Sequence, residues 1–309
     1  MHRRSFLGLA LSTNLGAPAA RTMLTRPIPK TKERLPVIGL GTWQTFDVGA
    51  SPAERGPVTE VLRRFLSAGG RVVDSSPMYG RAEEVTGDLL AVLEVERQRA
   101  ASASDGARRS APPFLATKVW TTGREAGIRE MKRSMKRLRA TRLELMQVHN
   151  LVDVETHLPV LREWKQAGTI RYLGVTHYQQ SESARIERLM RDEALDFVQI
   201  PYSLGRRQAE ARVLPAARDT GTAVLVMQPF ETGELFRRVK GQALPDFAAE
   251  FDCKSFAQFF LKFIVSHPAV TCPLPATSNP KHVDDNVQAG FGRLPDEALR
   301  RRMVAFFEA

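Results

Sequence analysis

Cysteine is scarce in this chain. Cys253 and Cys272 are the two cysteines among 309 residues, and they lack the short spacing of a zinc or redox motif. The sequence also has no His-x-His pair, which a metal-dependent barrel hydrolase would need. We therefore expect no metal site. Both cysteines are expected to be buried small residues, and the sequence leaves open whether they form a disulfide, because pairing depends on geometry.

Long apolar runs are also missing. No stretch approaches the roughly 18 apolar residues of a membrane-spanning helix, so we expect no integral membrane span. Hydrophobic residues make up 43% of the chain and charged residues 26%, which is typical of a globular protein. The net charge is +11, but the basic residues are spread along the chain without the interleaved aromatics of a nucleic-acid-binding stripe. This pattern favours a solvated surface over a nucleic-acid partner.

The first twenty residues have the composition of a targeting segment. Arg3-Arg4-Ser5-Phe6-Leu7 opens a modest apolar run, and Ala17-Pro18-Ala19 is similar to a signal cleavage site. Paired arginines before Phe-Leu resemble a twin-arginine signal. We therefore expect residues 1–20 to direct the folded protein, with any tightly bound nucleotide, through the twin-arginine export machinery to the periplasm. The alternative is a disordered basic tail on a cytoplasmic protein.

After residue 30, short apolar or β-branched runs alternate with longer segments of helical period. The expected strands are residues 37–43, 71–75, 114–119, 143–149, 172–177, 197–202, 223–228 and 270–276. The expected helices are residues 57–68, 83–97, 124–138, 156–167, 181–192, 209–220, 254–265, 281–288 and 296–307. Eight strands in alternation with helices predict a single (β/α)8 TIM barrel over residues 21–309. An open doubly wound sheet would want Gly-x-Gly-x-x-Gly after the first strand, and residues 39–43 (GLGTW) do not supply it.

Glycine and proline mark several element ends. Gly69-Gly70 and Gly168 follow expected helices, where glycine tolerates the left-handed cap. Pro57 stands where a first-turn proline would, since its missing N–H has no partner there. Residues 97–113 are rich in Ala, Ser and Arg. We expect them to form a flexible surface insertion on the face opposite the active site, with no catalytic role.

Functional groups in such a barrel gather at the carboxyl ends of the strands. The expected strand ends supply Asp74, Lys118 and His149, and Tyr79 follows shortly after Asp74. A phenol with an ordinary pKa of about 10 is a poor acid at neutral pH. An ammonium held nearby by a carboxylate is expected to lower that pKa, while the imidazole donates to a substrate oxygen as negative charge develops. The set suits proton transfer to a carbonyl, and the hydride must come from a cofactor.

Three segments, Asp74–Gly80, Leu115–Lys118 and Met146–His149, resemble the catalytic segments of the aldo-keto reductase family. The similarity extends from about Pro36 to Asn286. It implies a TIM barrel, NADP(H) bound without a Rossmann domain, and reversible reduction of a small carbonyl substrate. It also implies that Tyr79 is the general acid, that Lys118 and Asp74 tune it, and that His149 orients the carbonyl.

The same resemblance implies a set of cofactor contacts distributed over six strand ends. They are Gly41, Thr42, Asp74, Thr176, His177, Gln199, Met227, Pro229, Phe230, Gly233, Thr277, Lys281, His282, Asp285 and Asn286. Two departures affect the nicotinamide end: Thr176-His177 replaces the usual Ser-Asn pair, and Met227 stands where an aromatic ring usually stacks. These departures keep open an alternative function, a nucleotide-binding sensor or regulatory protein with the same barrel and little turnover.

The adenosine end departs from the family pattern as well. Ala276 and His282 stand where members that prefer NADP(H) often place lysine and arginine. Thr277 and Lys281 remain as possible phosphate ligands, so we expect NADP(H) to be favoured over NAD(H).

The substrate pocket is expected to be apolar and aromatic. Trp43, Phe46, Tyr79 and Trp120 belong to segments that leave the tops of the first three strands. Such a pocket favours aromatic or aliphatic aldehydes and ketones over highly charged sugars. The alternative for Trp43 and Trp120 is that they plug the end of the barrel.

Overall fold

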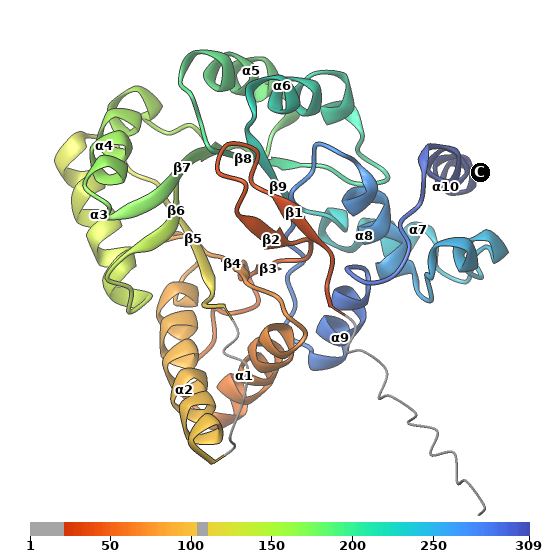
Figure 1. Cartoon of the computed structure of the whole chain (residues 1–309), viewed down its shortest axis with the longest axis horizontal. Coiled ribbons are helices and arrows are strands. Elements are labelled where there is room, and N and C mark those ends of the chain that lie inside the picture. The colour runs from red at the N-terminus through yellow and green to blue at the C-terminus, as the bar shows by residue number, and fades with distance from the viewer. Residues whose placement is uncertain (1–21, 104–110) are drawn as a thin grey trace, which may run out of the picture.

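Eight parallel strands form the centre of the molecule (Figure 1). The computed structural model describes residues 22–103 and 111–309, so the expected signal at residues 1–20 lies outside the described residues. The strands are β3 (Leu40–Gly41), β4 (Val72–Asp74), β5 (Phe114–Val119), β6 (Leu143–His149), β7 (Ile170–Thr176), β8 (Phe197–Pro201), β9 (Ala223–Met227) and β10 (Cys272–Pro273). Each overlaps one strand that the sequence predicted.

The sheet closes on itself between its first and last strands. Its order runs from β10 through β9, β8, β7, β6, β5 and β4 to β3, and a parallel bridge joins Gly41 to Ala276. Gly39 N donates to the Pro273 carbonyl at 2.9 Å, and Gly41 N donates to the Pro275 carbonyl at 3.1 Å. A Cβ at Gly39 would lie 2.6 Å from a methyl of Leu274, so glycine permits this close approach. The predicted (β/α)8 TIM barrel is confirmed.

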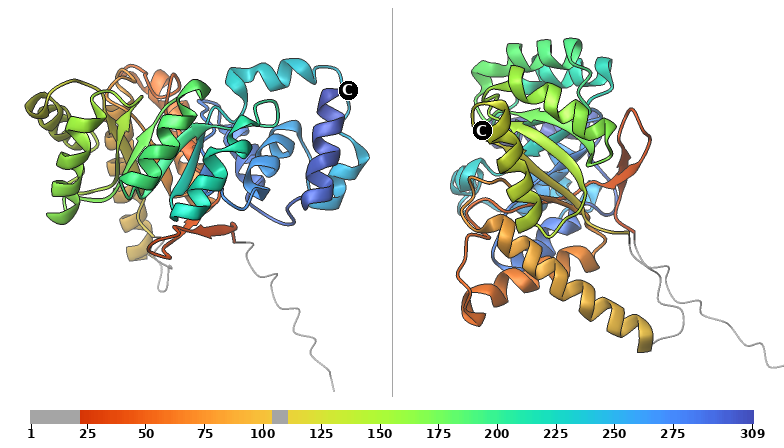
Figure 2. Two further views of the ribbon diagram at one scale, coloured as in Figure 1. Left: turned by 90° about the horizontal axis from the view of Figure 1, so that it is seen from above. Right: turned by 90° about the vertical axis from the view of Figure 1, so that its left-hand side faces the viewer.

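Helices surround the barrel on its outer side (Figures 1 and 2). They are α1 (Pro52–Ser67), α2 (Ala82–Ala103), α3 (Arg124–Arg137), α4 (Val154–Gln166), α5 (Ser183–Asp192), α6 (Val213–Thr220), α7 (Glu234–Arg238), α8 (Phe256–Ser266), α9 (Pro280–Gln288) and α10 (Glu297–Glu308). Short 3₁₀ turns occupy Gln180–Glu182, Gln208–Ala211, Glu231–Gly233 and Asp246–Phe251. Within the described ranges, no helix combines the length and the apolar character that a membrane span requires.

Two sequence predictions about helix ends were wrong. Helix α1 begins at Pro52 because Ser51 caps it, its hydroxyl accepting a hydrogen bond from Glu54 N at 3.3 Å. Pro52 is therefore the first-turn proline, and Pro57 lies inside the helix. Helix α2 continues to Ala103, so the first seven residues of the predicted insertion at 97–113 are helical, and residues 104–110 are outside the described part.

A hairpin that the sequence analysis missed covers one end of the barrel. Strands β1 (Thr25–Pro27) and β2 (Arg34–Pro36) pair antiparallel. Ile28 and Leu35 from this hairpin are buried in one apolar cluster with Phe114 and Phe197, the first residues of β5 and β8. The amino ends of the strands are thus closed, which leaves the carboxyl ends for a site. Both cysteines are buried, as expected, and both are free, so the disulfide that the sequence left open is not formed between them.

Candidate active site

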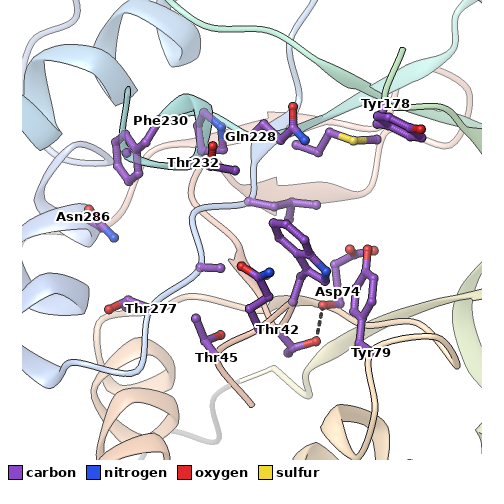
Figure 3. A pocket seen from close by; sticks show the side chains of 18 of the residues that line it. Thr42, Thr45, Asp74, Tyr79, Tyr178, Gln228, Phe230, Thr232, Thr277 and Asn286 are labelled. Carbon is purple, nitrogen blue, oxygen red and sulfur yellow. Dashed lines mark hydrogen bonds between the residues drawn. The ribbon is translucent and has the colours of Figure 1, made fainter. Parts of the chain in front are cut away.

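The carboxyl ends of the strands open into one large cavity. Its volume is about 1130 Å³, at the upper end of the range for small-molecule sites. Figure 3 shows that the cavity is elongated: Asn286 and Thr277 lie toward one end, and Asp74 and Tyr79 toward the other. Gln228 and Phe230 lie along the opposite wall.

A buried ion pair lies beneath the Tyr79 end of the cavity. Lys118 Nζ, at the end of β5, donates to Asp74 Oδ2 at 2.8 Å and to the Ser75 carbonyl at 2.7 Å. Gln199 Nε2 also donates to Asp74 Oδ2, at 3.1 Å. Burial, the largest single effect, lowers the pKa of Lys118, but Asp74 and Tyr79 together outweigh it, so the pKa is raised. The ammonium is therefore charged, with its carboxylate fixed by further donors.

Tyr79 lies above this pair. Lys118 Nζ is 5.1 Å from the centroid of the Tyr79 ring. The sequence analysis expected the ammonium to lower the pKa of the phenol, and this expectation was wrong for the net shift. Burial raises the pKa of Tyr79 by more than Lys118 lowers it. The phenol is therefore protonated at neutral pH, the form in which it can donate a proton.

His149 faces Tyr79 across the cavity. The two rings meet edge to face, with centroids 5.9 Å apart. Burial and then the charge of Lys118 lower the pKa of His149 to about 2, so the ring is neutral at ordinary pH. Its Nδ1 lies 3.0 Å from Ser76 Oγ.

Ser76 is a residue that the sequence analysis missed. Its Oγ lies 3.5 Å from the backbone N–H of Met78, which donates to it and leaves the Ser76 hydroxyl proton for His149 Nδ1. The remaining ring nitrogen, Nε2, then carries a proton and can donate to a ligand. Ser76 stands in the segment that contains Asp74 and Tyr79, and this proximity was the available signal.

Most of the expected cofactor positions line the cavity. They are Gly41, Thr42, Asp74, Gln199, Met227, Pro229, Phe230, Gly233, Thr277, His282, Asp285 and Asn286. Asp285 accepts hydrogen bonds from Ser255 Oγ at 2.7 Å and from Gln258 Nε2 at 2.6 Å. These contacts hold the carboxylate at the end of the cavity away from Tyr79.

Three expected cofactor positions do not line the cavity. Thr176 is fully buried at the end of β7. His177 stacks on Tyr178, with ring centroids 5.5 Å apart, and its Nδ1 accepts from Gln179 N. Tyr178 occupies the cavity wall in their place. Lys281 lies in the first turn of α9 with an exposed side chain, outside the wall.

The mouth of the cavity is apolar and aromatic. Trp43, Met78, Trp120 and Tyr178 line it and are each about 40 to 47% exposed. The expectation for Trp43 and Trp120 as pocket residues agrees with this placement. Phe46 was assigned wrongly: it is fully buried among core residues, because the turn after Thr42 directs it toward helix α1 rather than the cavity.

Residues 37–302 match the model of the Aldo/keto reductase family. This chain is an aldo-keto reductase by descent. The match covers more than half of the chain, and it agrees with the arrangement of Asp74, Tyr79, Lys118 and His149 at one end of the cavity.

The aldo-keto reductase chain has several similar relatives. It is 26% identical over 259 residues to the methylglyoxal reductase YeaE of Escherichia coli, covering 82% of this chain and 84% of that one. It is 26% identical over 238 residues to an NADH-specific methylglyoxal reductase of E. coli, covering 71% of each. The solved structure of an aldo/keto reductase from Klebsiella pneumoniae with NADP and acetate is similar, with a TM-score of 0.73, 22% identity, and coverage of 93% of this chain and 96% of that one.

The reductase cavity also contains polar positions that the sequence analysis did not name. They include Gln44, Thr45, Asn150, Gln228, Thr232 and Ser255. Most follow a strand directly or stand in the loop after it, so their placement depends on loop conformation rather than on strand periodicity. Among the described residues that line the cavity, there is no lysine or arginine. In the described part of the chain, no group of three or more metal-binding side chains could hold a metal ion.

Proposed function

We propose that this aldo-keto reductase reduces aldehydes and ketones to alcohols, with Tyr79 as the general acid and NADP(H) preferred over NAD(H). The observation that carries the proposal is the meeting of the phenol of Tyr79, the imidazole of His149 and the buried Lys118–Asp74 pair at one end of an elongated cavity. Proton donors and a dinucleotide-sized space thus adjoin each other.

The chain's own residues would act on the substrate oxygen. A carbonyl oxygen between Tyr79 and His149 accepts a hydrogen bond from His149 Nε2, which fixes its orientation. A reduced nicotinamide, when bound, would supply the hydride to the carbonyl carbon. Tyr79 then transfers its proton to the oxygen, and the ammonium of Lys118 stabilises the phenolate that this leaves. Asp74 keeps Lys118 in place, because it accepts from Nζ at 2.8 Å.

The cavity fits a dinucleotide along its length. Gln199 donates to Asp74 at the end of the cavity suited to nicotinamide, and Thr277 and Asn286 lie toward the other end (Figure 3). Met227 and Asp285 also line the cavity. The preference for NADP(H) rests on Thr277, which lines the cavity, and on the exposed ammonium of Lys281 in the first turn of α9. One similar solved structure holds NADP, whereas one relative is named as NADH-specific.

The phenol can be tested by substitution in the purified protein. Tyr79→Phe should lower the rate of NADPH oxidation with an aromatic aldehyde by about 10²- to 10⁴-fold, the usual contribution of a general acid. Tyr178→Phe is the matched control, because it removes a phenol from the cavity mouth and should leave the rate near wild type. Equal rates for Tyr79→Phe and wild type would contradict the mechanism. Negligible turnover by the wild-type protein would favour a nucleotide-binding sensor instead.

The apolar mouth supports a substrate class. Trp43, Met78, Trp120 and Tyr178 offer ring and thioether surface without a charged side chain. An aromatic aldehyde should therefore give a higher kcat/KM than a sugar aldehyde of similar size. A higher kcat/KM for the sugar aldehyde would contradict the proposal that the apolar mouth selects aromatic substrates.

We propose in addition that the enzyme acts in the periplasm after twin-arginine export. The proposal rests on Arg3-Arg4-Ser5-Phe6-Leu7 and on the small residues after it. Replacing Arg3 and Arg4 with lysines should retain a reporter fusion in the cytoplasm. Unchanged export of that fusion would show that the segment is not such a signal.

A further inference from the structure

The positive charge of the chain is less evenly spread than its sequence suggested. Residues 124–142 contain eight lysines and arginines but only two glutamates, a net charge of +6 out of +11 for the whole chain. The basic residues are Arg124, Arg129, Lys132, Arg133, Lys136, Arg137, Arg139 and Arg142. This segment comprises helix α3 and the turn that leads into β6. More than half of the net charge thus lies in one segment.

Four of these cations lie on one exposed face of α3. Arg129, Lys132, Arg133 and Lys136 follow the spacing i, i+3, i+4, i+7, which places them on one side of a helix. All four are exposed, whereas Gly127, Met131 and Ser134 are buried. At 100° per residue the cations centre opposite the buried side. The cationic face therefore points directly away from the barrel, at the periphery of the molecule in Figure 1.

Carboxylates neutralise the neighbouring cations but not this face. Arg124 pairs with Glu163 at 2.7 Å, Arg137 with Glu83 at 3.6 Å, and Arg139 with Asp88. By contrast, Lys132, Arg133 and Lys136 form no salt bridge with a carboxylate among the residues that the structure describes. The contact of Arg129 with Glu125 is long, at 3.7 Å, and highly exposed.

Other helices of the same protein show a different arrangement. On α1, Arg63 and Arg64 both contact Glu60. On α10, Arg301 contacts Glu297 and Arg302 contacts Glu250. Unneutralised like charges one turn apart destabilise a helix, so the stability of the fold does not favour the cationic face of α3. A binding partner with negative charge would account for it.

We infer that the cationic face of α3 binds peripherally to an anionic lipid surface. The face is straight, spans about 10 Å from Arg129 to Lys136 at 1.5 Å per residue, and carries the number of lysines and arginines typical of segments that bind acidic lipids. Helix α3 contains no aromatic residue for base stacking and no Asn or Gln for reading base edges. These absences favour lipid headgroups over nucleic acid.

The position of α3 leaves the active cavity accessible in such a complex. The helix begins at Arg124, four residues after Trp120 at the cavity mouth, and continues along the barrel wall toward the opposite end. Docking through this side would leave the mouth open beside the lipid surface. This inference does not depend on the proposed reductase activity.

Binding can be measured by co-sedimentation of the full chain with vesicles. The vesicles are equimolar phosphatidylglycerol and phosphatidylcholine, or phosphatidylcholine alone, in about 50 mM salt. Each cation near the surface contributes about fivefold to partitioning. We therefore expect the triple variant Lys132→Gln, Arg133→Gln, Lys136→Gln to bind the acidic vesicles about 100-fold more weakly.

A second triple variant controls for net charge. Arg188→Gln, Arg218→Gln and Lys240→Gln remove the same charge from exposed positions on α5, on α6 and just beyond α7. This control should bind the acidic vesicles within a few-fold of wild type, and thermal unfolding of both variants should match wild type. The expected segment at residues 1–20 contributes equally to all three proteins.

The inference is overturned if acidic vesicles bind no better than neutral ones. It is also overturned if both triple variants lose binding equally, which would mean a net-charge effect. A third outcome is measured by fluorescence anisotropy with duplex DNA. If the wild-type protein binds DNA but not vesicles, and only the α3 variant loses DNA binding, the partner of the cationic face is nucleic acid and not a lipid surface.

Discussion

At the scale of single residues, the contact between Ser76 and His149 determines which nitrogen of the imidazole carries a proton. The imidazole has two nitrogens, and the 3.0 Å contact of Nδ1 with Ser76 Oγ selects one tautomer. We infer that Ser76, which accepts the N–H of Met78, donates its own proton to Nδ1. Nε2 then carries the ring proton.

Removal of the Ser76 hydroxyl should weaken this selection. We expect Ser76→Ala to lower kcat about five- to tenfold, the value of one hydrogen bond of about 1 kcal/mol, with KM for the cofactor unchanged. Nitrogen NMR of His149 should show a mixture of tautomers in the variant and one tautomer in wild type. Ser76→Cys, which retains a weak donor, should recover part of kcat. A single unchanged tautomer in Ser76→Ala would contradict this role.

The pH dependence of reduction follows from the two shifted groups. The pKa of Tyr79 is raised above its ordinary value, so its acid form persists as pH rises through 9. The pKa of His149 is lowered to about 2, so the ring stays neutral as pH falls to 6. We expect kcat/KM for aldehyde reduction to be flat between pH 6 and 9. A titration with a midpoint inside that interval would contradict these assignments.

The convergence of the candidate catalytic residues could be predicted from sequence because strand ends in a barrel converge. Asp74 and His149 end β4 and β6, and Lys118 is the last residue but one of β5, so topology alone brings them together. Phe46 could not be placed in this way, since the turn after Thr42 decides whether it meets the cavity or the core. The pKa of Tyr79 depended on the balance of burial against the charge of Lys118, which a sequence does not give.

Helix α1 shows at the element scale how a proline's cost depends on its position. Pro52 occupies the first turn, where the backbone N–H has no partner in the helix. Pro57 stands inside the same helix and is exposed. There it removes the N–H that would bond to the carbonyl four residues earlier.

The two prolines form a matched pair for mutation. Pro57→Ala should raise the free energy of unfolding by about 2 kcal/mol, from roughly 3 kcal/mol of helix propensity less about 1 kcal/mol for a freer unfolded chain. Pro52→Ala should change it by less than about 0.5 kcal/mol. Urea denaturation measures both. Equal effects of the two substitutions would contradict the assigned start of the helix.

Element boundaries were predictable where the pattern was strong. Strands β5 and β6 match the sequence prediction residue for residue. Strands β3 and β10 are only two residues long, since glycine and proline limit the ladder at the seam of the barrel. The hairpin β1–β2 was missed because its three-residue strands are too short to show periodicity.

At the scale of the whole molecule, the barrel is covered at one end and has its cavity at the other, and this arrangement determines how a bound cofactor should change the stability of the fold. The hairpin seals the amino ends of the strands, and the cavity crosses the carboxyl ends of several strands. A ligand in this cavity contacts segments far apart in sequence, from Gly41 to Asn286. It binds the folded chain alone and therefore stabilises it.

Thermal unfolding with added nucleotide should report this linkage. At about 100 times Kd the stabilisation is about 2.7 kcal/mol, which corresponds to roughly 4 °C in Tm for a chain of 309 residues. We expect NADPH to give a larger shift than NADH at equal concentration, and Tyr79→Phe to retain the shift. A larger shift with NADH would reverse the cofactor preference, and no shift with either would contradict the dinucleotide assignment.

The fold class could be predicted from the whole sequence, because eight strand–helix units recur in order. The cofactor preference could not be predicted in this way. Ala276 and His282 stand where charged residues would decide it, and the described wall of the cavity contains neither lysine nor arginine.

Strands β1 and β2 cap the barrel at the end away from Tyr79. The hairpin therefore lies on the side opposite the cavity mouth. Coupling the protein to a bead or electrode through an exposed residue of this hairpin would orient every molecule with its mouth toward the solution. Immobilised enzyme should then consume substrate as fast per molecule as free enzyme.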